Sequence, residues 1–210
     1  MDEKYICEIK ALFPNIKLIF IARELVPRAW SALLMELRNS VIGLEAGVFE
    51  TSDNGSITNS NSSRNKREMD KLEQQCNPNQ YDDSYFMDRL MHSTHTSRCN
   101  YSKSLRLWLK HFPKEQLLII NYKDISNKPR SVLKQVCQHI NIDYESFIDS
   151  IDDEKLQERI NVGKTKEIIR PTLLKKMEDY LKHFTENFNE LLVELGYTWK
   201  LEDDYDNTIK

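Results

Sequence analysis

The sequence predicts an α/β fold in which a parallel sheet is flanked by helices. Two short apolar runs, at residues 17–23 and 116–122, have the length and continuous hydrophobicity of strands that are buried on both faces. Around them, apolar residues recur every three or four positions, as they do on the buried face of a helix. The resulting order, strand, helix, helix, strand, helix, helix, is typical of domains with parallel strands.

Length and composition fit one globular domain over residues 1–210. Hydrophobic residues make up 40% of the chain, which is enough for a core, and no run of 18 apolar residues would span a membrane. The net charge of −3 argues against nucleic acid as a partner, because such binding usually needs a basic excess. The N-terminus is charged from its second residue, so it encodes no signal peptide, and we expect the chain as given to be soluble.

The predicted helix after the first strand begins near Pro27, because proline favours the first turn of a helix. Its apolar face is expected to consist of Trp30, Leu33, Leu34, Leu37 and Val41. A second helix, within residues 101–112, leads into the second strand and carries on one face Leu105, Trp108, Leu109 and Phe112.

Two further helices follow the second strand. For the earlier one, Ser126 is the predicted N-cap and Pro129 lies in the opening turn. The later one begins at Pro171 and keeps its helical period until Gly196, a residue type that commonly ends helices.

Residues 51–80 lose this periodicity and gain serine, asparagine and charge, which indicates a polar surface insert. The two strong strands are fewer than a parallel α/β sheet usually has, and the sixteen residues before position 17 form no further strand. We therefore expect the chain to be the C-terminal part of a larger α/β unit, or to be completed by a partner chain.

The end of the first strand carries a candidate anion site. Ligands of open α/β sheets bind beyond the carboxyl ends of the strands, and Arg23 lies at such an end. Its guanidinium group suits phosphate oxygens, and the Ser31 hydroxyl on the next helix would add a donor. The alternative is structural: Arg23 pairs with a carboxylate such as Glu24, and Ser31 has no role.

The segment KLIFIARELVPRAWS resembles the 3′-phosphate-binding segment of the sulfotransferase superfamily, whose donor is 3′-phosphoadenosine 5′-phosphosulfate (PAPS). Residues 101–140 are similar to the helix, Phe-Pro link, strand and Tyr-acid-acid-Leu turn of that family, and the ending NELLVELGYTW is similar to its terminal helix. The resemblance implies that Arg23 and Ser31 bind the 3′-phosphate and that Tyr122 contacts the nucleotide. It also implies a P-loop-like fold, here without its N-terminal strand and phosphosulfate loop.

Several departures from the family pattern limit what the resemblance implies. Lys123 stands where the turn has its first acid, and Ile125 stands where it has leucine. No glycine- and lysine-containing loop for the 5′-phosphosulfate occurs near the N-terminus, and the catalytic base, which the family also places upstream, is unknown here.

Lys164 and Lys166 fall where the family often places a basic segment over the 3′-phosphate, although solvated lysines are the plainer interpretation. The adjoining Gly163-Lys164-Thr165 mimics the end of a nucleotide-triphosphate loop. However, Glu158 occupies the position of the required first glycine, which argues against a nucleotide kinase relative.

The resemblance therefore implies a PAPS-dependent sulfotransferase that is incomplete as given, with no metal. The alternative is a non-catalytic nucleotide-binding or interaction module that keeps a degenerate form of the fold. The acceptor stays open among carbohydrate, protein tyrosine and small alcohols. Residues 81–92 predict a short packing helix. Alternatively, a sugar or peptide groove is lined by Tyr81, Tyr85, Phe86, His92 and His95.

The cysteines do not settle the compartment. Cys76 and Cys99 would form a disulfide in an oxidising lumen. Together with His92 and His95 they would form a zinc site, although the spacing fits no standard pattern. The simpler interpretation is that all four are ordinary loop residues. Three Asn-X-Ser/Thr triplets keep a secretory route open. The Golgi lumen is expected if a membrane-anchored precursor supplies the N-terminus, and the cytoplasm otherwise.

Overall fold

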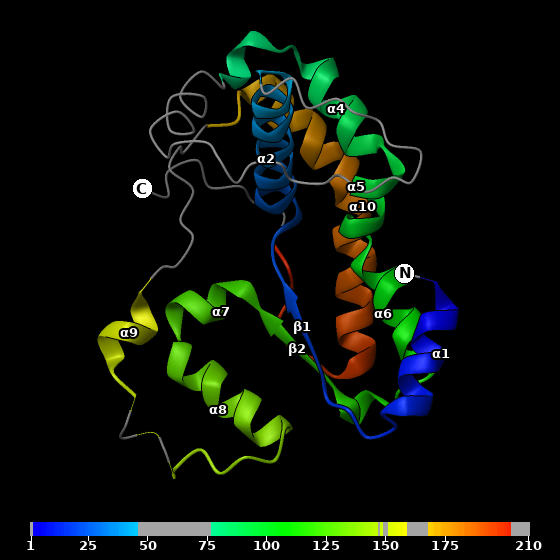
Figure 1. Cartoon of the computed structure of the whole chain (residues 1–210), viewed down its shortest axis with the longest axis vertical. Coiled ribbons are helices and arrows are strands. Elements are labelled where there is room, and N and C mark those ends of the chain that lie inside the picture. The colour runs from blue at the N-terminus through cyan, green and yellow to red at the C-terminus, as the bar shows by residue number, and fades with distance from the viewer. Residues whose placement is uncertain (1, 46–76, 147, 149–150, 159–167, 203–210) are drawn as a thin grey trace.

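The structure is a computed structural model that describes residues 2–45, 77–146, 148, 151–158 and 168–202 (Figure 1). Its strands, β1 (Leu18–Ala22) and β2 (Leu117–Asn121), pair in parallel and form the only sheet in that part of the chain. Leu18 pairs with Leu117 and Ala22 with Asn121, so both strands end at the same edge. The residues that follow the strands are therefore neighbours.

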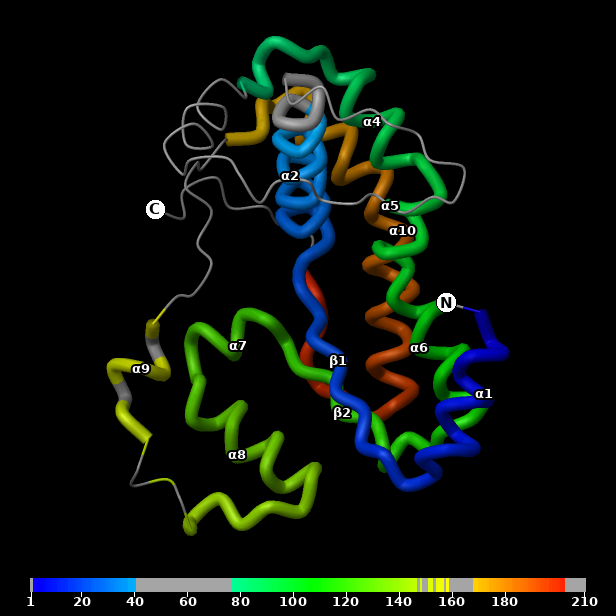
Figure 2. The backbone as a smooth tube through the Cα atoms, viewed as in Figure 1, coloured from blue at the N-terminus to red at the C-terminus, as the bar shows by residue number. Residues whose placement is uncertain are grey.

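Helices contributed by both halves of the chain form the main core. They are α2 (Leu25–Glu45), α4 (Asp83–Met91), α5 (Ser93–Cys99), α6 (Tyr101–Leu109) and α10 (Pro171–Leu195). The long helix α10 contacts α2, α4 and α6, and Figure 2 shows its path beside α6. Its buried side chains form the centre of the core. The predicted end of α10 is confirmed, because Gly196 adopts φ 90° as its C-cap.

Another group of helices lies on the other side of the sheet (Figure 1): α7 (Tyr122–Asn127), α8 (Pro129–His139) and α9 (Asp153–Gln157). Helix α8 contacts α7, α9 and β2. Helix α1 (Glu3–Leu12) precedes β1 and lies beside α6, where Glu3 bonds His111 at 3.0 Å. Short 3₁₀ turns at Pro78–Gln80 and Lys114–Gln116 complete the described elements.

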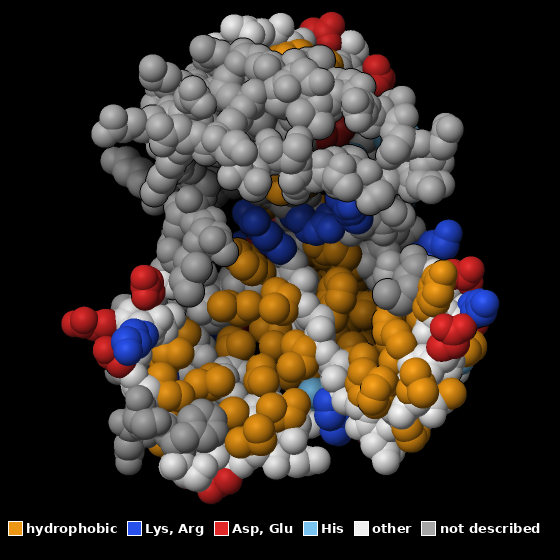
Figure 3. Space-filling view, in the orientation of Figure 1, with side chains coloured by type: hydrophobic (Ala, Val, Ile, Leu, Met, Phe, Trp, Pro, Cys, Tyr) orange, Lys and Arg blue, Asp and Glu red, His pale blue; other side chains and the backbone are white. Residues whose placement is uncertain are grey.

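The prediction that β1 is buried on both faces is wrong. Leu18, Phe20 and Ala22 point toward the core, whereas Ile19 and Ile21 are 43% and 50% exposed on the opposite face. Ile120, the β2 partner of Ile21, is only 4% exposed on that same face. Helix α8 therefore covers β2 and, although its His139 lies 3.1 Å from the Leu18 carbonyl oxygen, leaves Ile19 and Ile21 exposed. Figure 3 shows hydrophobic side chains gathered in this region.

Helix α2 begins at Leu25, so Pro27 lies in its first turn, as expected. The start of the helix after β2 differs from the prediction. Ser126 is not an N-cap but lies inside α7, because the Asn121 side chain accepts a hydrogen bond from the Lys123 amide and starts a helix earlier.

One further prediction is confirmed, and others concern residues that the structure does not describe. The short packing helix is confirmed as α4, which buries Phe86, Met87 and Leu90. Residues 51–76 of the insert, together with Cys76, lie outside the described residues, as does the Val41 side chain. In the described part of the chain, no helix is long and apolar enough to cross a membrane.

Candidate anion site at the strand ends

Arg23 is the first residue after β1 and is half-buried. Its main chain is held from the core side, because the Tyr101 hydroxyl donates a hydrogen bond to the Arg23 carbonyl oxygen at 3.1 Å. The ring of Tyr101 packs edge-on against Phe20 and Phe188, with centroids 5.0 and 5.3 Å away. The start of α6 thus fixes the point at which β1 leaves the sheet.

The structure brings two of the predicted ligands together. The guanidinium carbon of Arg23 lies 5.0 Å from the centroid of the Tyr122 ring. This contact follows from the sheet register, since Ala22 pairs with Asn121 and the next residues are Arg23 and Tyr122. A cation held over an aromatic face keeps its N–H groups free to bind an anion.

Glu24, the carboxylate that the structural alternative assigned to Arg23, has another partner. It is 7% exposed and its carboxylate oxygen lies 3.1 Å from Lys123 Nζ. Lys123 also contacts Glu202, and the hydrogen bonds that its ammonium group donates to Glu202 and then to Glu24 raise the Lys123 pKa. Within the ranges that the structure describes, no carboxylate lies at ion-pair distance from Arg23.

The ion pair between Glu24 and Lys123 was missed by the sequence analysis, although a signal for it existed. Lys123 occupies the position at which the similar turn in other proteins carries its first acid, and Glu24 directly follows Arg23, the predicted phosphate ligand. A base and an acid at the ends of adjacent parallel strands would lie close enough to pair.

Arg28 is a second cation that the sequence analysis missed. Its guanidinium carbon lies 5.5 Å from the Tyr101 ring centroid, and Nη1 lies 3.8 Å from the Cys99 sulfur. Among the described side chains no carboxylate pairs with Arg28 either. Figure 3 shows Lys and Arg side chains gathered where β1 leads into α2, and such a gathering favours anions.

Of the other predicted ligands, only Ser31 lies among the described residues. Ser31 is exposed on the second turn of α2, and its hydroxyl makes no hydrogen bond to Arg23 or to any other described residue. Lys164, Lys166 and the Gly163-Lys164-Thr165 tripeptide lie outside the described residues.

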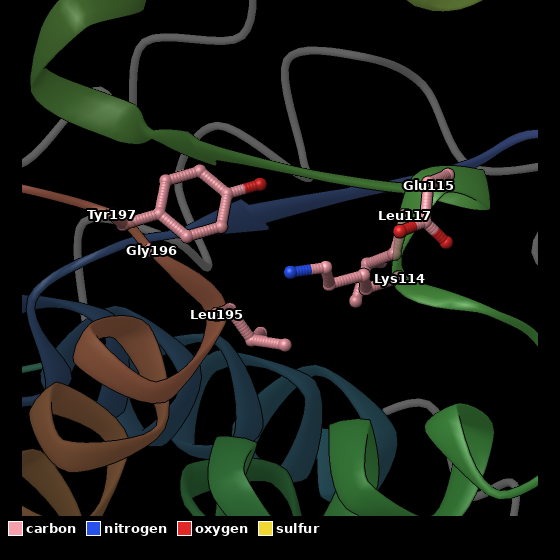
Figure 4. Close-up of a pocket in the computed structure, with 6 residues that line it drawn as sticks. All are labelled: Lys114, Glu115, Leu117, Leu195, Gly196 and Tyr197. Carbon is pink, nitrogen blue, oxygen red and sulfur yellow. The ribbon is translucent and has the colours of Figure 1, made fainter.

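A separate pocket of about 220 Å³ lies at the opposite end of the sheet (Figure 4). It is lined by Lys114, Glu115, Leu117, Leu195, Gly196 and Tyr197. Leu117 is the first residue of β2, so the pocket is at the amino ends of the strands, away from Arg23. Ligands of open α/β sheets bind at the carboxyl ends, so this pocket is not the expected donor site.

The histidines and cysteine considered for zinc have other contacts. His95 Nε2 lies 2.6 Å from a Glu36 carboxylate oxygen, and His92 caps α5 through the Thr94 amide. Cys99 is a buried free thiol, and burial raises its pKa. No cluster of three or more metal-ligating side chains occurs among the residues that the structure describes.

A parallel sheet flanked by helices, with two arginines near its carboxyl edge that pair with no described carboxylate, defines an α/β protein with a candidate anion site. Comparison with known proteins is more specific: residues 5–194 match the family model described as "Sulfotransferase domain". The chain therefore belongs to the sulfotransferase domain family, which confirms the resemblance found in the sequence.

The fold comparison agrees with this assignment. The chain is similar to the solved structure of a sulfotransferase from Alicyclobacillus acidocaldarius, with a TM-score of 0.52 and 14% sequence identity. The match covers 91% of this chain and 60% of the other, so the chain spans about three-fifths of that protein's length. The predicted sulfotransferase-type α/β fold is thus confirmed. The comparison with curated proteins gives no match.

Proposed function

We propose that this chain binds the 3′-phosphoadenosine part of PAPS and takes part in sulfuryl transfer to an acceptor hydroxyl or amine. The observation that carries the proposal is the position of Arg23. It lies at the carboxyl end of β1, stacks on Tyr122, and has no carboxylate partner among the described residues. A terminal phosphate would satisfy its N–H donors with charge-assisted hydrogen bonds.

The proposed roles follow from the chemistry of each group. Arg23 would bind the 3′-phosphate, Tyr122 would hold the guanidinium and contact the nucleotide, and Ser31 would donate its free hydroxyl. PAPS supplies the sulfuryl group that is transferred. Because the 3′-phosphate does not react, these residues bind ground state and transition state alike and act mainly on donor affinity.

The phosphosulfate loop and the catalytic base would come from residues beyond this chain, on a preceding segment or on a partner chain. Two features of β1 support this part of the proposal. In the described part of the chain β1 pairs only with β2, and Ile19 and Ile21 stay exposed beside it. A further parallel strand at that edge would extend the sheet, and the crossover helix that parallel strands need would cover Ile19 and Ile21.

Calorimetric titration with 3′-phosphoadenosine 5′-phosphate (PAP) tests the proposal. We expect PAP to bind more tightly than ATP or adenosine 5′-phosphate, and Arg23→Ala to weaken PAP binding by about 1.5–3 kcal/mol, or roughly 10- to 150-fold. Arg106→Ala is the matched control, because Arg106 is exposed on α6 and pairs with Glu194.

Equal affinities for PAP and adenosine 5′-phosphate would overturn the proposal. Binding of PAP without transfer activity in the full-length protein would favour the non-catalytic module.

A further inference from the structure

A cavity of about 690 Å³ lies between α2, α4 and α5. Its lining combines acidic, basic and amide side chains, which include Glu36, Asn39, Asp88, Arg89, His95 and Arg98. The acids balance the two arginines, so the cavity presents hydrogen-bond donors and acceptors in similar number. Ala32 and Met35 are the apolar residues of the described lining, and the carbon atoms of the polar side chains add further apolar surface.

The cavity begins next to the proposed donor site. Ser31, Met35 and Asn39 follow one another at intervals of four residues, so they lie on one face of α2. Met35 and Asn39 line the cavity, and Ser31 lies one turn before Met35. Each helical turn rises about 5.4 Å, so a molecule in the cavity would lie close to a nucleotide bound at Ser31.

Part of the cavity wall is fixed in position by buried polar contacts. Glu36 accepts the short hydrogen bond from His95 and lies 3.6 Å from Arg89 Nε. The His95 side chain is only 10% exposed, and Glu36 is its one side-chain partner among the described residues. Arg89 Nε is buried and makes no hydrogen bond within that part of the chain. These contacts orient the Glu36 carboxylate, whose side chain is 42% exposed and which a polar ligand would engage.

We infer that this cavity is the acceptor site and that it takes a saccharide; the inference rests on the proposed function. A sugar hydroxyl both donates and accepts hydrogen bonds, which matches a wall with both kinds of partner. A phenol or steroid would need mainly apolar walls, and a polyanion would need a basic excess. The balance of side chains therefore selects the carbohydrate class among the acceptors that the sequence leaves open.

Substitutions of Arg98 and Asp88, which both line the cavity, test whether a saccharide binds there. Both are exposed, and their side chains make no hydrogen bond or ion pair with described residues, so Arg98→Ala and Asp88→Asn should fold normally. The neutral hexasaccharides chitohexaose and cellohexaose are titrated calorimetrically, with 2-naphthol as the apolar comparison. We expect at least one hexasaccharide to bind with a Kd below the millimolar range and each variant to weaken it about tenfold or more. Arg106→Ala is again the control.

The same titrations with PAP separate the two proposals. PAP binding should be unchanged in Arg98→Ala and Asp88→Asn. If PAP binds but no hexasaccharide does, the acceptor-site inference fails while the donor site stands. If 2-naphthol alone binds and the variants abolish its binding, the inference is also overturned. Saccharide binding without PAP binding would support the saccharide site and contradict the proposed function.

Discussion

The hydroxyl of Tyr101 donates a hydrogen bond to the main-chain carbonyl oxygen of Arg23 across 3.1 Å. Tyr101 is 4% exposed, and this burial raises its pKa to about 12, so the phenol stays protonated at physiological pH. A residue that opens α6 therefore holds the strand end at which the proposed phosphate ligand emerges. The position of the candidate site depends on a contact between residues far apart in the sequence.

Tyr101→Phe should lower the free energy of unfolding by about 1 kcal/mol, because it removes one hydrogen bond and leaves a carbonyl oxygen unpaired. The ring contacts with Phe20 and Phe188 would remain. Urea denaturation measures the effect, and Tyr5→Phe on the exposed surface is the control. If both variants were equally stable, the bond to Arg23 would contribute nothing to the fold.

The elements that the sequence predicts well are those with a strong local signal. Helix α10 runs from Pro171 to Leu195, as expected from its apolar period and from the glycine that follows. Both strands were located within one residue at each end. These features depend on residues close together in the chain, so a pattern within the sequence is enough to find them.

The features that the sequence does not predict depend on contacts between distant segments. Neither the stacking of Arg23 on Tyr122 nor the pairing of Glu24 with Lys123 can be predicted without the register of β1 on β2. An apolar run likewise does not reveal which helix covers it, and this is why the exposure of Ile21 was missed. The cavity between α2, α4 and α5 is also formed by residues from separate segments of the chain.

The ion pair between Glu24 and Lys123 should stabilise the fold through the buried carboxylate. Glu24 has a 9% exposed side chain, and Lys123→Met removes its described partner. We expect Lys123→Met to cost about 1–3 kcal/mol, whereas the double variant Glu24→Gln, Lys123→Met should recover part of this loss. A double-mutant cycle by urea denaturation gives the coupling energy. A coupling energy near zero would mean that Glu24 is adequately solvated without Lys123.

Asp83 should make stability depend on pH at the acid end. Burial opposes ionisation of its carboxyl group, but hydrogen bonds from Arg170, Lys176 and Thr172 lower its pKa from 3.8 to about 2. A lowered pKa means that the folded state favours the charged form, so the contribution is complete above about pH 4 and is lost as the pH falls toward 2.

We expect this contribution to be about 1–2 kcal/mol, and Asp83→Asn to remove it. The urea midpoints of wild type and variant should therefore differ at pH 7 and converge as the pH falls from 4 to 2. Asp88→Asn is the control on the same helix, since Asp88 is exposed. A constant difference between wild type and Asp83→Asn across this range would contradict the assignment.

The uncovered face of β1 predicts an asymmetry between two paired strand residues. Ile21 and Ile120 are register partners on one face of the sheet, but they are 50% and 4% exposed. Replacement by threonine adds a hydroxyl, which is costly only where no water can reach it. Ile120→Thr should therefore cost about 2–3 kcal/mol in urea denaturation, and Ile21→Thr less than about 1 kcal/mol. Equal costs would indicate that another segment covers Ile21 in solution.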